Sequence, residues 1–332
     1  MNNATFTSPW RHLLWPGVTL LVLIVFNLLF TDGFADIKIV NGHLYGSLVD
    51  IFHRGTPVIL VAIGMTLVIA TEGVDLSVGS IMAIAGSIAA ILLLQGVPVP
   101  LVILACLGAG LAAGLWNGAL VAFLKLQPIV ASLILMVAGR GIAQLLTDSQ
   151  KPTFDVPAFN FLGTGFVLGV PFTIPLSIFV LVATILLVRK TALGLFIESV
   201  GSNAEASYYA GINEKRVKLI VYAFCGLTAA LAGIIITADV QQADPASTGL
   251  FYELDAILAV VIGGTALQGG RFFLGGTVIG ALIIQTLKTT ILTLGIDPKW
   301  ELVVKALVVI LVCLLQSEKF RKKITRKRRQ TA

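Results

Sequence analysis

The chain has 332 residues, of which 57% are hydrophobic and only 12% are charged, with a net charge of +6 and a mean hydropathy of +0.97. A soluble domain would carry roughly 25% charged residues, so the composition excludes a soluble protein. The apolar runs are continuous rather than alternating, which excludes a β-barrel and predicts an all-α, polytopic membrane helix bundle over residues 1–332 as a single domain.

The first apolar segment, residues 13–31, follows Arg11 and His12 much as the core of a secretory signal follows its basic residues. The segment is longer than a signal core, and no small-x-small cleavage site comes after it, so we predict a retained membrane span. We predict ten spans in all, with a probable inverted repeat. They cover residues 13–31, 56–71, 78–95, 99–123, 127–147, 172–189, 217–237, 254–268, 275–294 and 301–316.

The positive charges predict the orientation of these spans. With both termini in the cytosol, the outer loops keep only Lys38, Arg54, Lys151 and Lys299, and the other loop cations lie inside. The tail, residues 317–332, holds eight basic residues from Lys319 to Arg329. We expect this tail to anchor on anionic lipid, and nucleic-acid binding is the alternative.

Residues 71–80 interrupt the apolar pattern with two carboxylates, two glycines and two serines. Asp75 or Ser77 is a suitable cap for a helix that begins here, so one interpretation is a capped helix beside a tight turn. The other is that the segment lines or gates a transport path, because irregular backbone at membrane depth must pack in protein or face water.

A second irregular segment, residues 263–276, contains six glycines, which permit close approach of the backbone. The two interruptions suggest that spans two to five and spans seven to ten are related halves of opposite orientation, as in many transporters.

Polar side chains inside the spans are candidates for the lining of a path. Arg140 is the most unusual, and its alternative role is an ion pair or bonding to backbone carbonyls. Asn117 and Gln285 have interhelical hydrogen bonding as their alternative role, and Lys288 can extend its stem to an interface. The candidate path residues are Asp75, Ser77, Asn117, Arg140, Gln144, Gln285 and Thr289.

Enzymatic chemistry has no support in the sequence. Cys106, Cys225 and Cys313 lie in apolar segments, and the three histidines form no ligand-spaced cluster, so we expect no catalytic residues, no metal and no cofactor. The chain contains no phosphate-binding loop of the Gly-x-x-x-x-Gly-Lys-Ser/Thr type, so ATP hydrolysis would have to come from another chain.

The loop over residues 190–216 combines a short helical segment, glycines and polar groups between two apolar spans. Such a surface facing the cytosol predicts a docking site, and we expect it to couple the chain to a motor protein. The candidate coupling residues are Gly194, Glu198, Gly201, Asn203, Glu205, Gly211 and Ile212.

Several motifs together resemble the ribose-type permeases of ABC importers, and the resemblance covers nearly the whole chain. They are Gly-Met-Thr-Leu-Val-Ile-Ala-Thr at 64–71 with Gly-Val-Asp-Leu-Ser-Val-Gly-Ser at 73–80, Gly-Ser-Asn at 201–203 with Gly-Ile at 211–212, and the stretch 263–276. Within that family the galactofuranose-type permeases are most similar, through residues 137–141, 190–194, 254–264 and 280–285. Glu72 departs from the family pattern, in which this position often holds a small or different residue.

The resemblance implies a subunit of an ATP-driven importer in the bacterial inner membrane, which moves a monosaccharide, galactofuranose first, by alternating access. Ribose, xylose, arabinose or another small sugar, autoinducer-type molecules and branched-chain amino acids are alternatives. The implied partners are a second permease subunit, an ABC ATPase and a periplasmic sugar-binding protein. A different class, an ion-driven secondary transporter, would use Glu72, Asp75, Arg140 and Lys288 as a relay.

Overall fold

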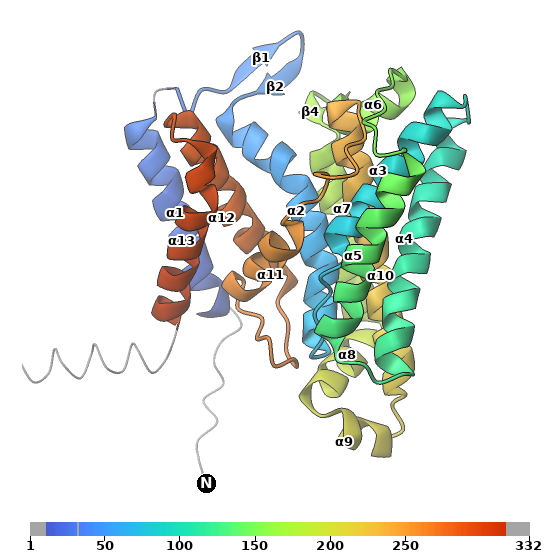
Figure 1. Cartoon of the computed structure of the whole chain (residues 1–332). Coiled ribbons are helices and arrows are strands. Elements are labelled where there is room, and N and C mark those ends of the chain that lie inside the picture. Colours follow the sequence, from blue (N-terminus) through green and yellow to red (C-terminus); the bar gives the residue numbers. More distant parts are fainter. Residues whose placement is uncertain (1–10, 32, 317–332) are drawn as a thin grey trace, which may run out of the picture.

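The computed structural model describes residues 11–31 and 33–316, which form a helical bundle (Figure 1). The longer helices are α1 (Arg11–Phe30), α2 (Ser47–Ala70), α3 (Val78–Leu94), α4 (Val99–Ala122), α5 (Pro128–Leu146), α7 (Thr173–Lys190), α10 (Glu214–Val240), α11 (Tyr252–Ile262), α12 (Leu274–Thr293) and α13 (Glu301–Gln316). Shorter elements are α6 (Pro157–Thr164), α8 (Leu193–Ser202), α9 (Ala204–Tyr209) and the 3-10 turn Pro298–Trp300. The all-α polytopic bundle is thus confirmed.

Seven of the described helices are long and apolar enough to cross a membrane: α1, α2, α4, α5, α7, α10 and α12. Each remaining predicted span also contains a helix, but α3, α11 and α13 are shorter, so the number of ten crossings stays a prediction. The span predicted for 254–268 ends early, at Ile262. Gly263 packs there against the backbone of Gly276, and Gly264 has a φ of +91°, which an α-helix does not allow.

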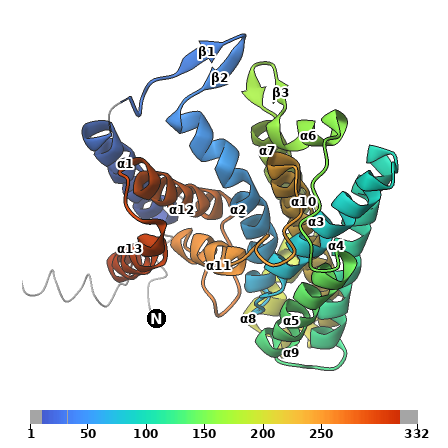
Figure 2. The same ribbon diagram turned by 45° about the horizontal axis from the view of Figure 1, so that its top comes forward.

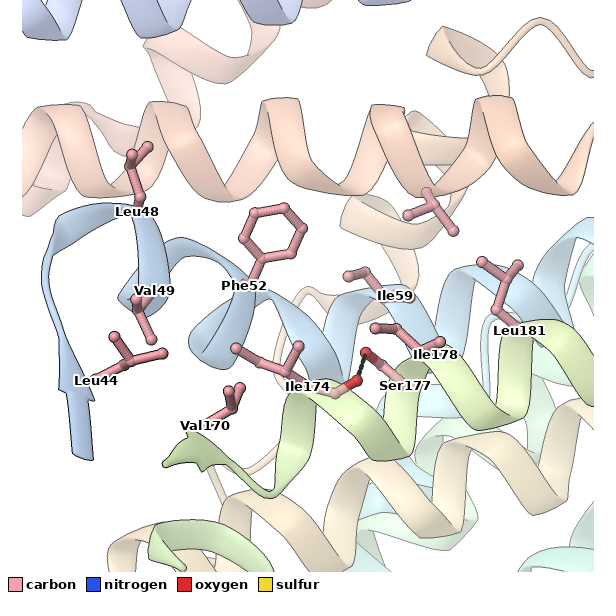
Figure 3. Close-up of a pocket in the computed structure, with 11 residues that line it drawn as sticks. Leu44, Leu48, Val49, Phe52, Ile59, Val170, Ile174, Ser177, Ile178 and Leu181 are labelled. Carbon is pink, nitrogen blue, oxygen red and sulfur yellow. Dashed lines mark hydrogen bonds between the residues drawn. The ribbon is translucent and has the colours of Figure 1, made fainter. Parts of the chain in front are cut away.

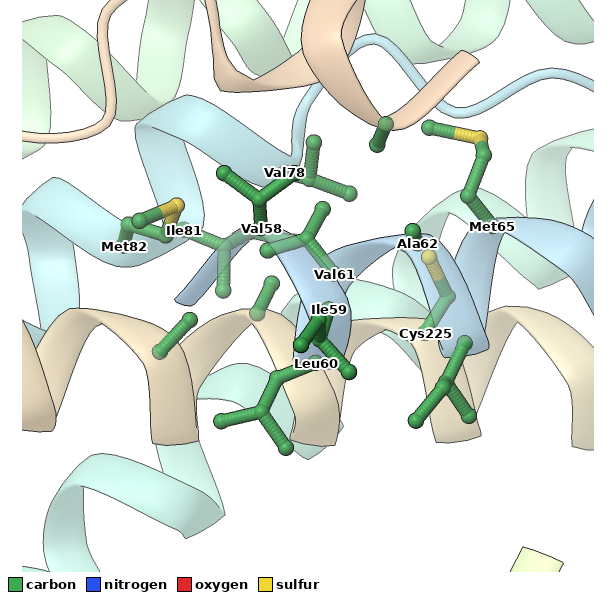
Figure 4. Packing of buried hydrophobic residues seen from close by; sticks show 14 of the residues in the cluster. Val58, Ile59, Leu60, Val61, Ala62, Met65, Val78, Ile81, Met82 and Cys225 are labelled. Atoms are coloured by element: carbon green, nitrogen blue, oxygen red, sulfur yellow. The ribbon is translucent and has the colours of Figure 1, made fainter. Parts of the chain in front are cut away.

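Helix α2 lies at the centre of the bundle (Figure 2). Helices α1, α12 and α13 lie on one side of it, and α3, α4, α5 and α10 lie on the other. The segment from Val58 to Ala70 is apolar except for Gly64 and Thr66, and the Thr66 hydroxyl donates to Ala62 O at 2.7 Å, so the helix can be buried without an unpaired hydroxyl. Figure 4 shows this segment packed against α3 and Cys225 of α10.

The two ends of the bundle differ in structure. One end, which we call the hairpin face, carries α6 and two antiparallel hairpins, β1 (Lys38–Val40) with β2 (His43–Tyr45) and β3 (Phe166–Val167) with β4 (Val170–Pro171). The hairpins are joined by a hydrogen bond from Leu44 N–H to Gly169 O at 2.7 Å. The opposite end, which we call the α9 face, carries α8 and α9. The basic tail lies outside the described residues, so its lipid contact stays a prediction.

An apolar cavity of about 310 Å³ lies between α2 and α7 (Figure 3). Phe52 and aliphatic side chains line it, and its one hydroxyl, that of Ser177, already donates to Ile174 O at 2.8 Å. Apart from the Ser177 oxygen, the lining side chains offer a polyhydroxylated ligand no hydrogen-bonding group, so the candidate site lies elsewhere.

Candidate translocation site

The predicted interruption between α2 and α3 is a stretch of irregular backbone packed inside the protein. Helix α2 ends at Ala70, and Glu72 has a φ of +63°, while the N–H groups of residues 71–73 still bond to carbonyls at 68 and 69. Helix α3 begins at Val78, and its Gly79 packs on the backbone of Gly249. The loop 241–251, between α10 and α11, therefore reaches the start of α3.

Asp75, Ser77 and Asn117 form one buried hydrogen-bonded group, and each of the three is 0% exposed. Asp75 Oδ1 accepts from the Ser77 N–H at 3.0 Å, the Ser77 hydroxyl at 2.6 Å and the Asn117 amide at 3.1 Å. The Asn117 amide also donates to Ser77 Oγ at 2.8 Å. Three predicted path residues thus meet, and in this conformation they are closed off from solvent.

A polar cavity of about 660 Å³ opens on the α9 face next to this group. The Tyr222 hydroxyl, which donates to Val74 O at 3.4 Å, forms part of its wall. Its charged lining residues are Glu72, Lys125, Glu214 and Lys218.

Arg140 holds the backbone of the loop 241–251. Its Nη1 donates to Thr248 O at 2.7 Å and to Pro245 O at 3.2 Å, which is the carbonyl-binding alternative for this residue. The guanidinium thereby ties α5 to the loop that meets Gly79 at the start of α3.

We expect Arg140→Lys to loosen this loop, because a lysine cannot reproduce two bonds from one planar guanidinium. Transport should fall roughly tenfold, the effect of losing one charge-assisted interaction. Hydrogen exchange of the N–H groups in 246–251 should quicken at the same time. Unchanged exchange would contradict the role given to Arg140, and Arg189→Lys, at an exposed position near the end of α7, is a suitable control.

The same loop is also held by an ion pair of 2.6 Å between Lys151 Nζ and Asp244 Oδ2. Partial burial raises the pKa of Asp244, but hydrogen bonds from Lys151, Ser247 and Ala246 outweigh it and lower the pKa from 3.8 to about 2. A carboxyl group whose pKa is lowered by folding stabilises the folded state at any pH above its ordinary pKa. This contribution is lost as the pH falls through the lowered pKa.

The difference in unfolding temperature between the wild type and Asp244→Asn is therefore expected to stay constant from neutral pH down to about pH 4. It should shrink as the pH falls from 3.8 toward 2. Scanning fluorimetry in detergent measures this difference, and a difference that already declines near neutral pH would contradict the assignment.

Gln285 and Thr289 line a second polar cavity of about 380 Å³, which lies at the hairpin face between α2, α10 and α12. His53 is beside it, with Nδ1 2.7 Å from Thr173 Oγ1 and Nε2 3.8 Å from Asp239 Oδ1. This group of predicted path residues is separate from the Asp75 group. The other polar lining residues are Asp50, Arg54, Tyr252, Lys288 and Thr293.

Comparison with known proteins identifies the family. Residues 47–313 match the family described as the permease component of the branched-chain amino acid transport system. The chain belongs to this permease family.

Three relatives extend almost the whole length of this permease. Galactofuranose transporter permease protein YtfT of Escherichia coli (strain K12) is 50% identical over 319 residues, covering 95% of this chain and 94% of that one. Fructose import permease protein FruF of Bifidobacterium longum (strain NCC 2705) is 42% identical, covering 93% and 88%. Ribose import permease protein RbsC of Escherichia coli (strain K12) is 36% identical, covering 95% and 96%. The predicted resemblance is thus confirmed.

The predicted coupling loop forms α8 and α9 on the α9 face of the permease. Asn203 caps α9 by accepting from the Ala206 N–H at 2.8 Å, and Gly211 has a φ of +85° at the turn that follows. Asn203, Glu205 and Gly211 are exposed, Glu198 and Ile212 are partly buried, and Gly194 and Gly201 are buried. The seven residues therefore divide into a surface set and a set that packs inside the bundle.

Gly201 packs on the end of α2. A side chain there would collide with Ala70 O and lie 2.6 Å from the amide nitrogen of Gly270, which itself donates to Ala70 O at 2.9 Å. A Cβ at Gly269 would lie 2.7 Å from Gly201 O and 2.9 Å from Glu72 N. We call Ala70, Glu72, Gly201, Gly269 and Gly270 the glycine junction. It joins α8, the interruption before α3 and the predicted glycine-rich segment.

The permease also contains a buried ionic cluster that the sequence analysis missed. Lys305 of α13 is 4% exposed and donates to both carboxylate oxygens of Asp255 on α11, at 2.8 and 2.9 Å, and lies 2.7 Å from Glu301 Oε1. Lys288 lies 3.9 Å from the same Glu301 oxygen. A carboxylate in the predicted span 254–268 and a lysine in the predicted span 301–316 were the available signal. Gln144, the last predicted path residue, is partly buried one turn beyond Arg140 and belongs to none of these groups.

Proposed function

We propose that the chain is the permease subunit of an ATP-driven ABC importer that moves a monosaccharide, with galactofuranose as the first candidate. The observation that carries this proposal is the 50% identity to the galactofuranose permease over nearly the full length of both chains. Relatives with fructose and ribose in their names support a sugar as the substrate class. The permease translocates, and a separate ATPase subunit hydrolyses ATP.

We propose that the α9 face lies in the cytosol, together with both termini, and that the hairpin face lies in the periplasm of a bacterial inner membrane. The distribution of basic residues supports this orientation. The exposed part of the coupling loop, including Glu205 and Asn203, then docks on the ATPase. The hairpin face receives the sugar from a periplasmic binding protein, and a second permease subunit, identical or different, completes the translocation unit.

Alternating access is the mechanism that the two polar cavities support. One cavity opens at the hairpin face beside Gln285 and Thr289, and the other opens at the α9 face beside Tyr222. We propose that the closed Asp75 group and the loop held by Arg140 form the layer that separates the two cavities. We propose that movement of α8, passed through the glycine junction, opens this layer to one side and then the other.

Uptake of labelled galactofuranose by cells that express the permease with its partners tests the substrate. Unlabelled fructose, ribose and xylose serve as competitors, since each could share the hydroxyl-binding groups of the path. Galactofuranose should compete best. If fructose, ribose or xylose displaces the label at a lower concentration than unlabelled galactofuranose does, the substrate assignment is wrong and the importer assignment remains.

A further inference from the structure

The carboxyl group of Asp75 is enclosed by protein and unevenly bonded. Oδ1 accepts three hydrogen bonds, whereas Oδ2 is buried and has no hydrogen-bond partner. Asn117 shows the same imbalance, because its amide nitrogen donates twice and its Oδ1 is buried without a partner. Two oxygens without a hydrogen-bond partner are thus left over on two side chains that already share a hydrogen bond.

No positively charged side chain of the described residues is paired with a carboxylate at this position. Within residues 11–31 and 33–316, no lysine, arginine or histidine nitrogen lies within 4.0 Å of Asp75. The uncharged side chains Tyr222 and Cys225 of α10 lie close enough to Asp75 to interact with it electrostatically. From α5, the Ser132 hydroxyl donates to Val74 O at 3.4 Å. The surrounding charged side chains are Glu72, Lys125, Glu214 and Lys218, which line the α9-face cavity, and Glu253 of α11, whose Oε2 lies 2.7 Å from the position of a Cβ at Gly79.

Two features favour an anion here and a stronger one opposes it. The start of α3 carries a partial positive charge of about half an electron, and the three bonds to Oδ1 also favour the ionised form. Complete burial of an unpaired carboxylate is so unfavourable, however, that such a group binds a proton instead. An anion would also leave Oδ2 and Asn117 Oδ1 both unsatisfied.

We propose that Asp75 is a neutral carboxylic acid and that this group is a binding site for one proton inside the membrane. The proton is held on Oδ2 and donated to Asn117 Oδ1, so that the acid and the amide form a two-bond ring with the existing bond of 3.1 Å. Two free oxygens suit a proton and not a metal ion, which would take about six ligands.

With a proton at this site, Glu72 is the one charged side chain in the interruption between α2 and α3. The segment that joins the glycine junction to α3 can then rearrange without moving a bare carboxylate through the membrane. The proposal concerns the state of the chain itself and does not rest on the identity of the transported molecule.

Infrared difference spectroscopy of the full chain in lipid nanodiscs at neutral pH tests the proposal directly. The spectrum of the wild type minus that of Asp75→Asn should show the carbonyl-stretch band of a protonated carboxylic acid. Asp239→Asn is the matched control, because the Asp239 side chain is 44% exposed and should contribute a carboxylate band instead. Absence of the acid band from the Asp75 difference spectrum, with a carboxylate band in its place, would overturn the proposal.

The stability of two variants gives an independent test. The amide of Asp75→Asn is uncharged and offers a donor where the acid has its O–H, whereas Asp75→Ala offers none. The asparagine variant should unfold close to the wild-type temperature and the alanine variant well below it. Equal loss of stability in both variants would show that the site requires the negative charge, which contradicts a neutral acid.

Discussion

Replacement of Gly201 by leucine is expected to abolish uptake while the protein still inserts into the membrane. The new side chain would have to enter the space occupied by Ala70 O and the Gly270 N–H, and both are backbone atoms that cannot rotate away. Overpacking costs roughly 1–3 kcal/mol even where side chains can yield. We expect the glycine junction to be forced apart, and uptake to fall at least about a hundredfold.

Gly275→Leu is the matched control for this substitution. Gly275 lies in the same glycine-rich segment, at the start of α12, and a Cβ there would meet no atom within 4 Å. Uptake and the amount of protein in the membrane fraction are measured for both variants. Wild-type uptake by Gly201→Leu would show that the glycine junction does not transmit movement from α8.

The largest loss of stability is expected from Lys305→Met. The substitution keeps the length of the side chain but leaves Asp255 as a buried carboxylate without its cation, and breaking a buried ion pair from one side costs about 3–5 kcal/mol. Glu301 would keep only Lys288, at 3.9 Å. Thermal unfolding in detergent should therefore begin several degrees earlier than in the wild type.

The double variant Lys305→Met with Asp255→Asn distinguishes charge from packing. Because it removes both members of the pair, it should recover much of the stability lost in the single variant. The stability lost on Asp255→Asn is also measured in the wild type. If the substitution costs the same when it is added to Lys305→Met, the two side chains act independently. The ionic cluster would then not be what joins α11 to α13.

Sequence patterns located single polar residues better than they located the partners of those residues. Asp75 and Asn117 were conspicuous because each interrupts an apolar run, yet nothing in a single sequence shows that side chains 42 positions apart share a hydrogen bond. For Arg140 the sequence left the path and the backbone carbonyls as alternatives, and the structure shows the carbonyl bonds.

Other features were missed because the same residues fit a simpler pattern. The loop 241–251 has no distinguishing pattern between the predicted spans 217–237 and 254–268, but its Gly249 packs on Gly79 at the start of α3. Lys305 stands alone in a predicted apolar span, and the sequence does not show that its partner, Asp255 in another span, lies next to it. The sequence predicts Gly201 to be part of a docking surface. Its role in packing depends on contacts with the backbone of other segments, which the sequence does not show.

The measurement that tests the importer proposal most directly is sugar uptake into proteoliposomes that hold the permease with its ATPase and sugar-binding protein. Uptake should occur only when all three proteins and ATP are present, and omission of any one of them should abolish it. Uptake by this chain alone, driven by an ion gradient, would contradict the account and identify the chain as a secondary transporter.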